Sequence, residues 1–196
     1  RGPVLILAGA GSGKTRVITY RISSLVLNHS VPPHSILAVT FTNKAAEEMK
    51  NRVASLLGTP DHRVWIRTFH STCIRILRKN ADKIGINNNF TILDDSDQQA
   101  LIKEVLSSLN IDAKQYRPSY IASIISREKE KLRGPADFEG DEIIRSVYSL
   151  YEKRLNVMSG LDFDDLILKT VTLFREKKDV LEKYQEMWKY IMIDEY

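Results

Sequence analysis

A short apolar run that enters a glycine-rich loop and then an amphipathic helix is the feature that most constrains this chain. The run occupies residues 4–8 (VLILA), and the loop continues to Thr15 with the letters GAGSGKT. From Thr15 to Asn28, apolar residues recur with the period of a helix. A strand buried on both faces, a tight loop and a helix in this order predict the phosphate-binding unit of a parallel α/β sheet.

The glycine-rich loop has the composition that a triphosphate requires. The general pattern is G-x-x-x-x-G-K-[ST], and here Ala8 takes the place of the first glycine. Glycines let successive backbone N–H groups face the phosphates, Lys14 supplies a positive charge, and Thr15 supplies a hydroxyl for Mg²⁺. A glycine-rich turn that binds nothing is the alternative. We predict nucleotide binding at Ala8, Gly9, Ala10, Gly11, Ser12, Gly13, Lys14 and Thr15.

Three further apolar runs predict strands of the same sheet. They are residues 36–41 (ILAVTF), 64–69 (VWIRTF) and 190–194 (YIMID). A helical pattern, capped by Asn43 and closed by Gly58, separates the first two of these runs. Strands that alternate with helices in this way predict a parallel sheet with crossover helices.

A long helical block is expected to interrupt the sheet. From Ser71 to about Trp188 the helical period dominates, with a capping-box pattern at Ser96 and Gln99 and a helix start at Pro118. Residues 133–141 have the Gly and Pro content of a loop. We therefore expect a first part of the sheet domain over 1–75, an all-helical insertion over 76–187 and a return strand over 188–196.

Two carboxylates follow the last predicted strand. Asp194 and Glu195 lie where a parallel sheet presents residues to a nucleotide, at the carboxyl edge. An Asp there can hold a metal through its water shell, and a Glu beside it can orient and deprotonate the attacking water. The alternative is a chance acidic pair in a solvated tail.

The composition limits the cellular compartment and the kinds of partner that we expect for the protein. The chain has a single cysteine, Cys73, which excludes an internal disulfide, and it shows neither a leader pattern nor an apolar run that spans a bilayer. We expect a cytoplasmic protein with no membrane partner. Basic residues outnumber acidic ones by only 29 to 25, but six basic residues face one acidic residue between Arg63 and Lys83. Such an excess suits nucleic-acid phosphates, or a solvated helix face.

Taken together, five segments resemble the N-terminal part of a superfamily 1 DNA helicase of the UvrD/PcrA/Rep type. They are LAGAGSGKTR, VTFTNKAAEEMKNRV, RTFHS, LDFDDLI and IMIDEY, and the alanine at position 8 is usual in that family. The resemblance implies a P-loop, RecA-like motor lobe interrupted by an all-helical subdomain. It also implies ATP and Mg²⁺ as cofactors, and ATP hydrolysis coupled to movement on single-stranded DNA and duplex unwinding.

The same resemblance assigns roles to single residues. Lys14 and Glu195 would be catalytic, Thr15 and Asp194 would hold the metal, and Arg16 would contact the nucleotide. Seven residues would face the DNA: Thr40, Phe41, Thr42, Asn43, Thr68, Phe69 and His70. The chemistry of these residues supports the transfer in part, because Phe41 offers a ring for base stacking. Aromatic rings at strand ends are more often core, however, which is the interpretation that physics alone favours for Phe41 and Phe69.

Two charged segments are interpreted as structural. The acids of LDFDDL, Asp162, Asp164 and Asp165, are expected to point in different directions at a helix start, favoured there by the helix dipole rather than by a metal. Residues 126–134 (SREKEKLRG) are expected to form an exposed helix of mixed charge.

The resemblance also implies that the chain is a piece of a longer protein. Its expected partners are single-stranded DNA, single/double-strand junctions and a second motor lobe of the same parent chain, and the piece alone should not unwind DNA. Two other functions stay open. One is a P-loop phosphotransferase acting on a small substrate, and the other is a DNA-binding module with a non-catalytic nucleotide site.

Overall fold

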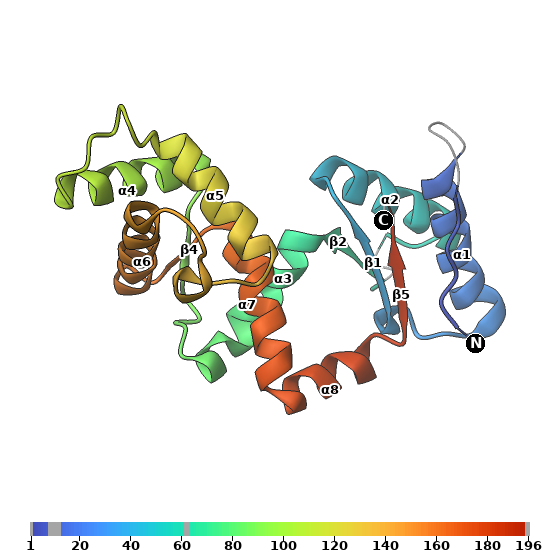
Figure 1. Cartoon of the computed structure of the whole chain (residues 1–196). Coiled ribbons are helices and arrows are strands. Elements are labelled where there is room, and N and C mark those ends of the chain that lie inside the picture. Colours follow the sequence, from blue (N-terminus) through green and yellow to red (C-terminus); the bar gives the residue numbers. More distant parts are fainter. Residues whose placement is uncertain (1, 8–12, 61–62, 195–196) are drawn as a thin grey trace. The chain divides into compact units, whose positions relative to one another are not determined.

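The computed structural model describes residues 2–7, 13–60 and 63–194, and the chain forms two compact units (Figure 1). Unit 1 comprises Arg1–Thr72 and Leu181–Tyr196, and unit 2 comprises Cys73–Val180. The elements in chain order are α1 (Lys14–His29), the 3₁₀ helix η1 (Pro33–Ser35), β1 (Ile36–Thr40), α2 (Asn43–Leu57), β2 (Trp65–Thr68), α3 (Phe69–Asn80), η2 (Ala81–Ile84), β3 (Thr91–Ile92), α4 (Asp95–Ser108), α5 (Pro118–Glu130), η3 (Pro135–Asp137), α6 (Glu142–Val157), β4 (Gly160–Leu161), α7 (Phe163–Glu176), α8 (Lys178–Met187) and β5 (Tyr190–Ile193).

Unit 1 contains a three-stranded parallel sheet with the order β2-β1-β5. Thr40 of β1 is in register with Thr68 of β2, and Val39 is in register with Ile193 of β5. The strands therefore end together at one edge, although β5 lies more than a hundred residues beyond β2 in the sequence. The predicted parallel sheet with a crossover helix between β1 and β2 is confirmed.

The first two helices and the sheet share one hydrophobic core. Ile22 of α1, Met49 and Val53 of α2, and Ile36 and Ala38 of β1 are buried together. Ile36 and Ala38 are two residues apart, so they point to the same face of the sheet, and α1 and α2 cover that face. This packing fixes the helix that follows the phosphate loop against the strand that neighbours β5.

The first predicted strand is not formed among the described residues. Residues 2–7 adopt no strand, and the side chains of Val4 and Leu7 are 84% and 86% exposed (Figure 1). Ile191 and Ile193 of β5, the edge strand, are also exposed. Apolar composition favours burial, but a strand forms only where a neighbouring ladder accepts its hydrogen bonds. Ala8, the last residue of the predicted strand, lies outside the described part of the chain.

The start of α2 differs by one residue from the prediction. Thr42 is the N-cap, and its hydroxyl accepts a hydrogen bond from the N–H of Ala45 at 3.1 Å; Asn43 is the first helical residue. Gly58 closes the helix in the left-handed conformation, with φ 68°, as the sequence predicted. Thr42 is favoured because its backbone is still extended, which lets its oxygen reach the first free N–H groups.

The start of α4 also differs from the prediction. Asp94 is the N-cap and forms a capping box with Asp97, whereas Ser96 and Gln99 do not. The carboxylate of Asp94 accepts hydrogen bonds from the N–H groups of both Ser96 and Asp97. A carboxylate has more acceptor capacity than a hydroxyl and also interacts favourably with the helix dipole.

Unit 2 is mainly helical but is not the all-helical block that the sequence predicts. Two short strands, β3 and β4, pair in parallel within it, with Thr91 opposite Gly160 and Ile92 opposite Leu161. The runs are two residues long, too short to carry a recognisable strand pattern. The core of the unit combines residues of α4, α5 and α6 with Leu93: Leu101, Ile102, Val105, Leu106, Ile121, Ala122, Ile125, Val147, Tyr148, Tyr151 and Leu155.

Within the described residues, no helix has both the length and the apolar character needed to cross a bilayer.

Candidate nucleotide site and nucleic-acid interface

The start of α1 is arranged as an anion site. Gly13 precedes the helix with φ 87° and ψ 26°, a left-handed conformation that favours glycine. Lys14 and Thr15 open the first turn, which contains no acidic residue. The N–H groups of a first helical turn have no partner within the helix, and they carry the positive end of the helix dipole. This end of α1 can therefore receive a phosphate.

Thr15 and Asp194 are brought together from opposite ends of the chain. The hydroxyl of Thr15 donates a hydrogen bond to the Oδ2 atom of Asp194 at 2.8 Å. Asp194 is only 5% exposed, and its N–H donates to the carbonyl of Val39 at 2.9 Å, which continues the pairing of β5 with β1. A hydroxyl and a buried carboxylate in contact beside a helix start provide hard oxygen ligands of the kind that Mg²⁺ prefers.

Several predicted site residues lie outside the described residues. They are Ala8, Gly9, Ala10, Gly11 and Ser12 of the loop, and Glu195 beside Asp194. Gly13, Lys14, Thr15 and Arg16 are described, and they occupy consecutive positions at the start of α1. Arg16 is exposed, and its guanidinium carbon lies 5.4 Å from the ring centre of Tyr20 on the next turn.

Phe41 lies in the two-residue connection between β1 and α2 and is 63% exposed. Its ring meets the edge of the Phe69 ring, with centroids 5.6 Å apart and planes at 61°. Phe69 is half-buried at the start of α3. The preference for a core position, which physics alone favoured, is therefore wrong for Phe41. The pair presents an aromatic surface at the carboxyl ends of β1 and β2, where a base can stack.

Thr40 and Thr68, which were also expected to face DNA, are buried. They are 1% and 6% exposed and lie opposite each other in the sheet. The hydroxyl of Thr68 donates to the hydroxyl of Ser71 at 2.9 Å, and the N–H of Thr68 donates to the same Ser71 oxygen at 3.0 Å. Ser71, which the sequence analysis missed, therefore fixes the turn from β2 into α3. Its signal was the three-residue spacing from a threonine at a strand end.

The remaining members of the expected DNA-facing set lie nearer the surface. Thr42 and Asn43 are exposed, with the hydroxyl of Thr42 used as the cap of α2. His70 is half-buried in the first turn of α3. The structure thus gathers Phe41, Thr42 and Asn43 at an exposed position beside Phe69.

Part of the basic run from Arg63 to Lys83 is used within the protein. A guanidinium N–H of Arg78 donates to the carbonyl of Asn88 at 2.9 Å, and its guanidinium carbon lies 3.9 Å from the ring centre of Phe90. Lys83 forms an ion pair with Asp179. Arg78 and Lys83 thus hold a loop and a helix start in unit 2. Fewer basic side chains can therefore bind phosphates than the count of charges in the sequence indicates.

The expectation of an exposed mixed-charge helix over residues 126–134 is wrong at Glu128 and Lys129, although Arg127, Glu130 and Lys131 are exposed. Glu128 and Lys129 of α5 are 7% and 2% exposed. Lys129 falls four residues after Ile125, which itself follows Ile121 by four, so it continues the apolar stripe of the helix. That spacing was the signal in the sequence for its burial.

The ammonium of Lys129 lies among three carboxylates. Its Nζ is 2.8 Å from Glu152, 2.7 Å from Asp162 and 3.0 Å from Asp165. Two acids of LDFDDL therefore converge, contrary to the expectation that they point in different directions, because the capping box of α7 turns both toward α5. Burial opposes the charge of Lys129, but the carboxylates raise its pKa well above the usual value. Burial also raises the pKa of Asp165, to about 6.

Comparisons with known proteins agree on one family. A family profile described as the UvrD/REP helicase N-terminal domain matches residues 1–196. The chain is 49% identical over 201 aligned residues to the ATP-dependent DNA helicase PcrA of Staphylococcus aureus, and equally to that of Staphylococcus epidermidis. Each alignment covers 100% of this chain and 28% of the relative, so the chain spans little more than a quarter of the length of these proteins.

Proposed function

The chain belongs to the UvrD/REP helicase family, and from this premise we propose that it forms the first motor lobe of an ATP-dependent DNA helicase. The whole protein would couple ATP hydrolysis to movement on single-stranded DNA and to duplex unwinding. The observation that carries the proposal is the 2.8 Å contact between Thr15 and Asp194. It joins the residue after the phosphate-loop lysine to the acid at the carboxyl edge of the sheet.

The nucleotide side of the mechanism follows from this contact. Backbone N–H groups of residues 8–16 and the ammonium of Lys14 would hold the triphosphate of ATP. The Thr15 hydroxyl and the Asp194 carboxylate would hold Mg²⁺, directly or through its water shell. When bound, the metal would neutralise charge on the phosphate oxygens. Glu195, the residue after Asp194, would orient the attacking water and accept its proton.

The DNA side would use the ends of the neighbouring strands. The seven residues of the expected DNA-facing set lie at the ends of β1 and β2 or at the starts of α2 and α3. The exposed Phe41 ring would stack on a base, and Thr40 and Thr68, being buried, would position this edge rather than touch DNA. Adjacent strands lie about 4.8 Å apart. A structural change at Asp194 would therefore be transmitted to the DNA-facing residues through the single neighbouring strand β1.

The proposal also assigns segments of the chain to domains. Residues 1–75 and 188–196 would form the RecA-like motor lobe, and residues 76–187 the helical insertion. Single-stranded DNA and single/double-strand junctions would be the substrates. A second motor lobe, supplied by the rest of the parent chain, would close on the ATP site.

Substitution of the phosphate-loop lysine tests the ATPase assignment. In the complete protein, Lys14→Ala should lower kcat for ATP hydrolysis by roughly 100-fold or more, because the transferred phosphoryl group loses a charge that stabilises its transition state. Lys103→Ala, an exposed lysine on α4, serves as the control and should keep the wild-type rate. Wild-type turnover in Lys14→Ala would refute the assignment, and DNA-independent phosphoryl transfer to a small acceptor would favour a phosphotransferase.

Removal of the exposed ring tests the DNA side. Phe41→Ala should weaken single-stranded DNA binding by about 1–3 kcal/mol, the contribution of one base stacked on an aromatic ring. Fluorescence anisotropy of a labelled oligonucleotide measures this loss, and ATP hydrolysis without DNA should not change. Tyr120→Ala removes another exposed aromatic ring, 54% accessible, and should bind DNA normally. Equal DNA affinity of Phe41→Ala and the wild type would exclude the stacking role.

A further inference from the structure

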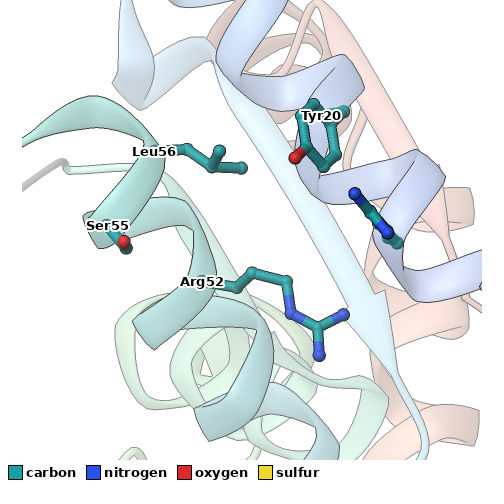
Figure 2. Close-up of a pocket in the computed structure, with 5 residues that line it drawn as sticks. Tyr20, Arg52, Ser55 and Leu56 are labelled. Atoms are coloured by element: carbon teal, nitrogen blue, oxygen red, sulfur yellow. The ribbon is translucent and has the colours of Figure 1, made fainter.

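A pocket on unit 2 is lined by residues that the ATP and DNA sites do not use. It differs from a pocket between α1 and α2 on unit 1 (Figure 2), which contains Arg16 and so belongs to the helix start assigned to ATP. The volume of the unit 2 pocket is about 230 Å³, below the roughly 300 Å³ at which small-molecule sites usually begin. It therefore suits a single side chain better than a whole small molecule.

Four carboxylates line this pocket because the two short strands of unit 2 run in parallel. The N–H of Leu93, just after β3, donates to the carbonyl of Leu161 in β4 at 2.9 Å. Since α4 follows β3 and α7 follows β4, the two helices start beside each other. Acidic residues are favoured at helix starts, so here they gather at one place. They are Asp94, Asp95, Asp162 and Asp164.

The negative charge of the pocket is only partly balanced. Asp162 is paired with the buried ammonium of Lys129 at 2.7 Å. Among the residues that the structure describes, no basic residue lines the pocket, and Asp94, Asp95 and Asp164 form no ion pair. Burial and the neighbouring Asp162 carboxylate raise the pKa of Asp164 above its usual value. A positively charged ligand would relieve this repulsion.

Apolar side chains adjoin the carboxylates and narrow the choice of ligand. Phe163 lines the pocket and is 43% exposed, and Ile167, one turn further along α7, is 42% exposed. Residues four apart lie on the same face of a helix. An arginine guanidinium can stack on an aromatic ring while it donates parallel hydrogen bonds to carboxylates, a combination that a metal ion does not use. DNA phosphates would be repelled by the carboxylates.

We propose that this pocket docks an arginine side chain from an apolar segment of a partner protein. The guanidinium binds Asp95 and Asp164 and stacks on Phe163, and a neighbouring apolar residue of the partner packs on Ile167. Arginine is enriched among the few residues that carry most of the binding energy of an interface. Unit 2 thereby gains a protein-binding surface built from residues other than those assigned to ATP and DNA.

Calorimetric titration of the complete protein with a tripeptide amide of leucine, arginine and leucine tests the proposal. The peptide should bind roughly tenfold more tightly than its analogue with citrulline, the uncharged isostere of arginine. The double variant Asp95→Asn/Asp164→Asn should weaken binding by a similar factor, and it keeps the N-cap residues of α4 and α7. Phe163→Leu should weaken binding about two- to fivefold, through loss of the cation–π contact.

A matched control removes the same charge elsewhere. Glu139→Gln/Glu176→Gln changes two exposed acids outside the pocket and should bind the peptide normally. Circular dichroism checks that each variant is folded. Lys14→Ala should also bind the peptide normally, so a failure of this proposal is distinguishable from a failure of the ATPase assignment.

Other results would overturn the proposal. Equal affinity for the citrulline peptide would exclude recognition of the charge, and normal affinity in Asp95→Asn/Asp164→Asn would place the peptide elsewhere. Displacement of the peptide by Mg²⁺, at an ionic strength matched with NaCl, would identify a metal site. Displacement by single-stranded DNA would identify a nucleic acid as the occupant, and a dimer that the double variant abolishes would identify a second copy of the chain.

Discussion

At the scale of single residues, Lys129 shows how a charge can become part of a core. One ammonium meets three carboxylates, so the cluster around Lys129 carries excess negative charge. The Tyr151 hydroxyl offsets part of this excess by donating to Asp162 at 2.7 Å. Burial alone would raise the pKa of Asp162, but the ammonium of Lys129 keeps that pKa below its usual value. Asp165 therefore retains a proton more readily than Asp162.

The raised pKa of Asp165 predicts a specific pH dependence of stability. The unfolded chain releases this proton near pH 3.8, whereas the folded state retains it to about pH 6. Folding therefore binds a proton between these values, and the contribution of Asp165 to stability falls as the pH rises through this window. The shift corresponds to roughly 3 kcal/mol. Asp165→Asn removes this titration, so the stability of the variant relative to the wild type should rise between pH 4 and pH 7.

Urea unfolding at pH 4.5 and pH 7.5, followed by circular dichroism, measures the effect of Asp165→Asn. Glu139→Gln, a change at an exposed acid, is the control and should follow the wild-type profile. A constant difference between Asp165→Asn and the wild type at both pH values would contradict the prediction.

At the scale of elements, the ends of α2 decide what the carboxyl edge of the sheet exposes. β1 ends at Thr40 and α2 begins at Asn43, which leaves Phe41 and Thr42 as the whole connection. The Thr42 hydroxyl caps the helix, so Phe41 is the residue carried past the sheet edge into an exposed position. The exposure of Phe41 thus follows from where two elements meet.

The other end of α2 predicts a stability difference between two glycines. Gly58→Ala should destabilise the protein by about 1–2 kcal/mol, because a side chain is strained at φ 68° even though nothing lies within 4 Å of the added Cβ. Gly134→Ala is the matched control, with an open Cβ position and φ −93°. It should be neutral or slightly stabilising. Thermal unfolding of the two variants compares them directly, and equal midpoints would exclude strain at Gly58.

At the scale of the whole molecule, unit 1 exposes apolar side chains, and the chain spans only part of the length of its relatives. Residues 4–7 and the edge strand β5 present apolar side chains to solvent, a surface of the kind that packs against further structure. The chain spans 28% of the length of the PcrA relatives. We therefore expect that catalysis requires a larger assembly than this chain.

Residues 1–196 on their own should show no DNA-stimulated ATP hydrolysis and no unwinding. The proposed site lies at the carboxyl edge of the sheet, and a motor needs a second lobe to close on ATP and exclude water. A phosphate-release assay with and without single-stranded DNA measures the first activity, and strand separation of a labelled duplex measures the second. The complete protein is the positive control. A DNA-stimulated rate from the isolated chain would contradict the two-lobe requirement.

The sequence by itself determined the features that depend on neighbours along the chain. Of the four strands that the sequence predicts, three are present. The parallel sheet, the glycine that ends α2 and the helix start at Pro118 were also predicted correctly. Helical period, apolar runs and turn residues are patterns among neighbouring residues, so they can be recognised from the sequence alone. The helix that follows the predicted phosphate loop could be located for the same reason, whereas residues 8–12 of that loop lie outside the described residues.

Only the tertiary structure decided which distant residues meet and which side chains are buried. It exposed Phe41, buried Lys129 among three carboxylates and left residues 4–7 without a strand. It also gave the direct contact between Thr15 and Asp194, 179 positions apart, which only the family resemblance had implied. Each of these outcomes depends on whether a partner element lies opposite, and neither composition nor periodicity specifies that partner. Burial is a property of two surfaces in contact, and a single segment of sequence encodes only one of them.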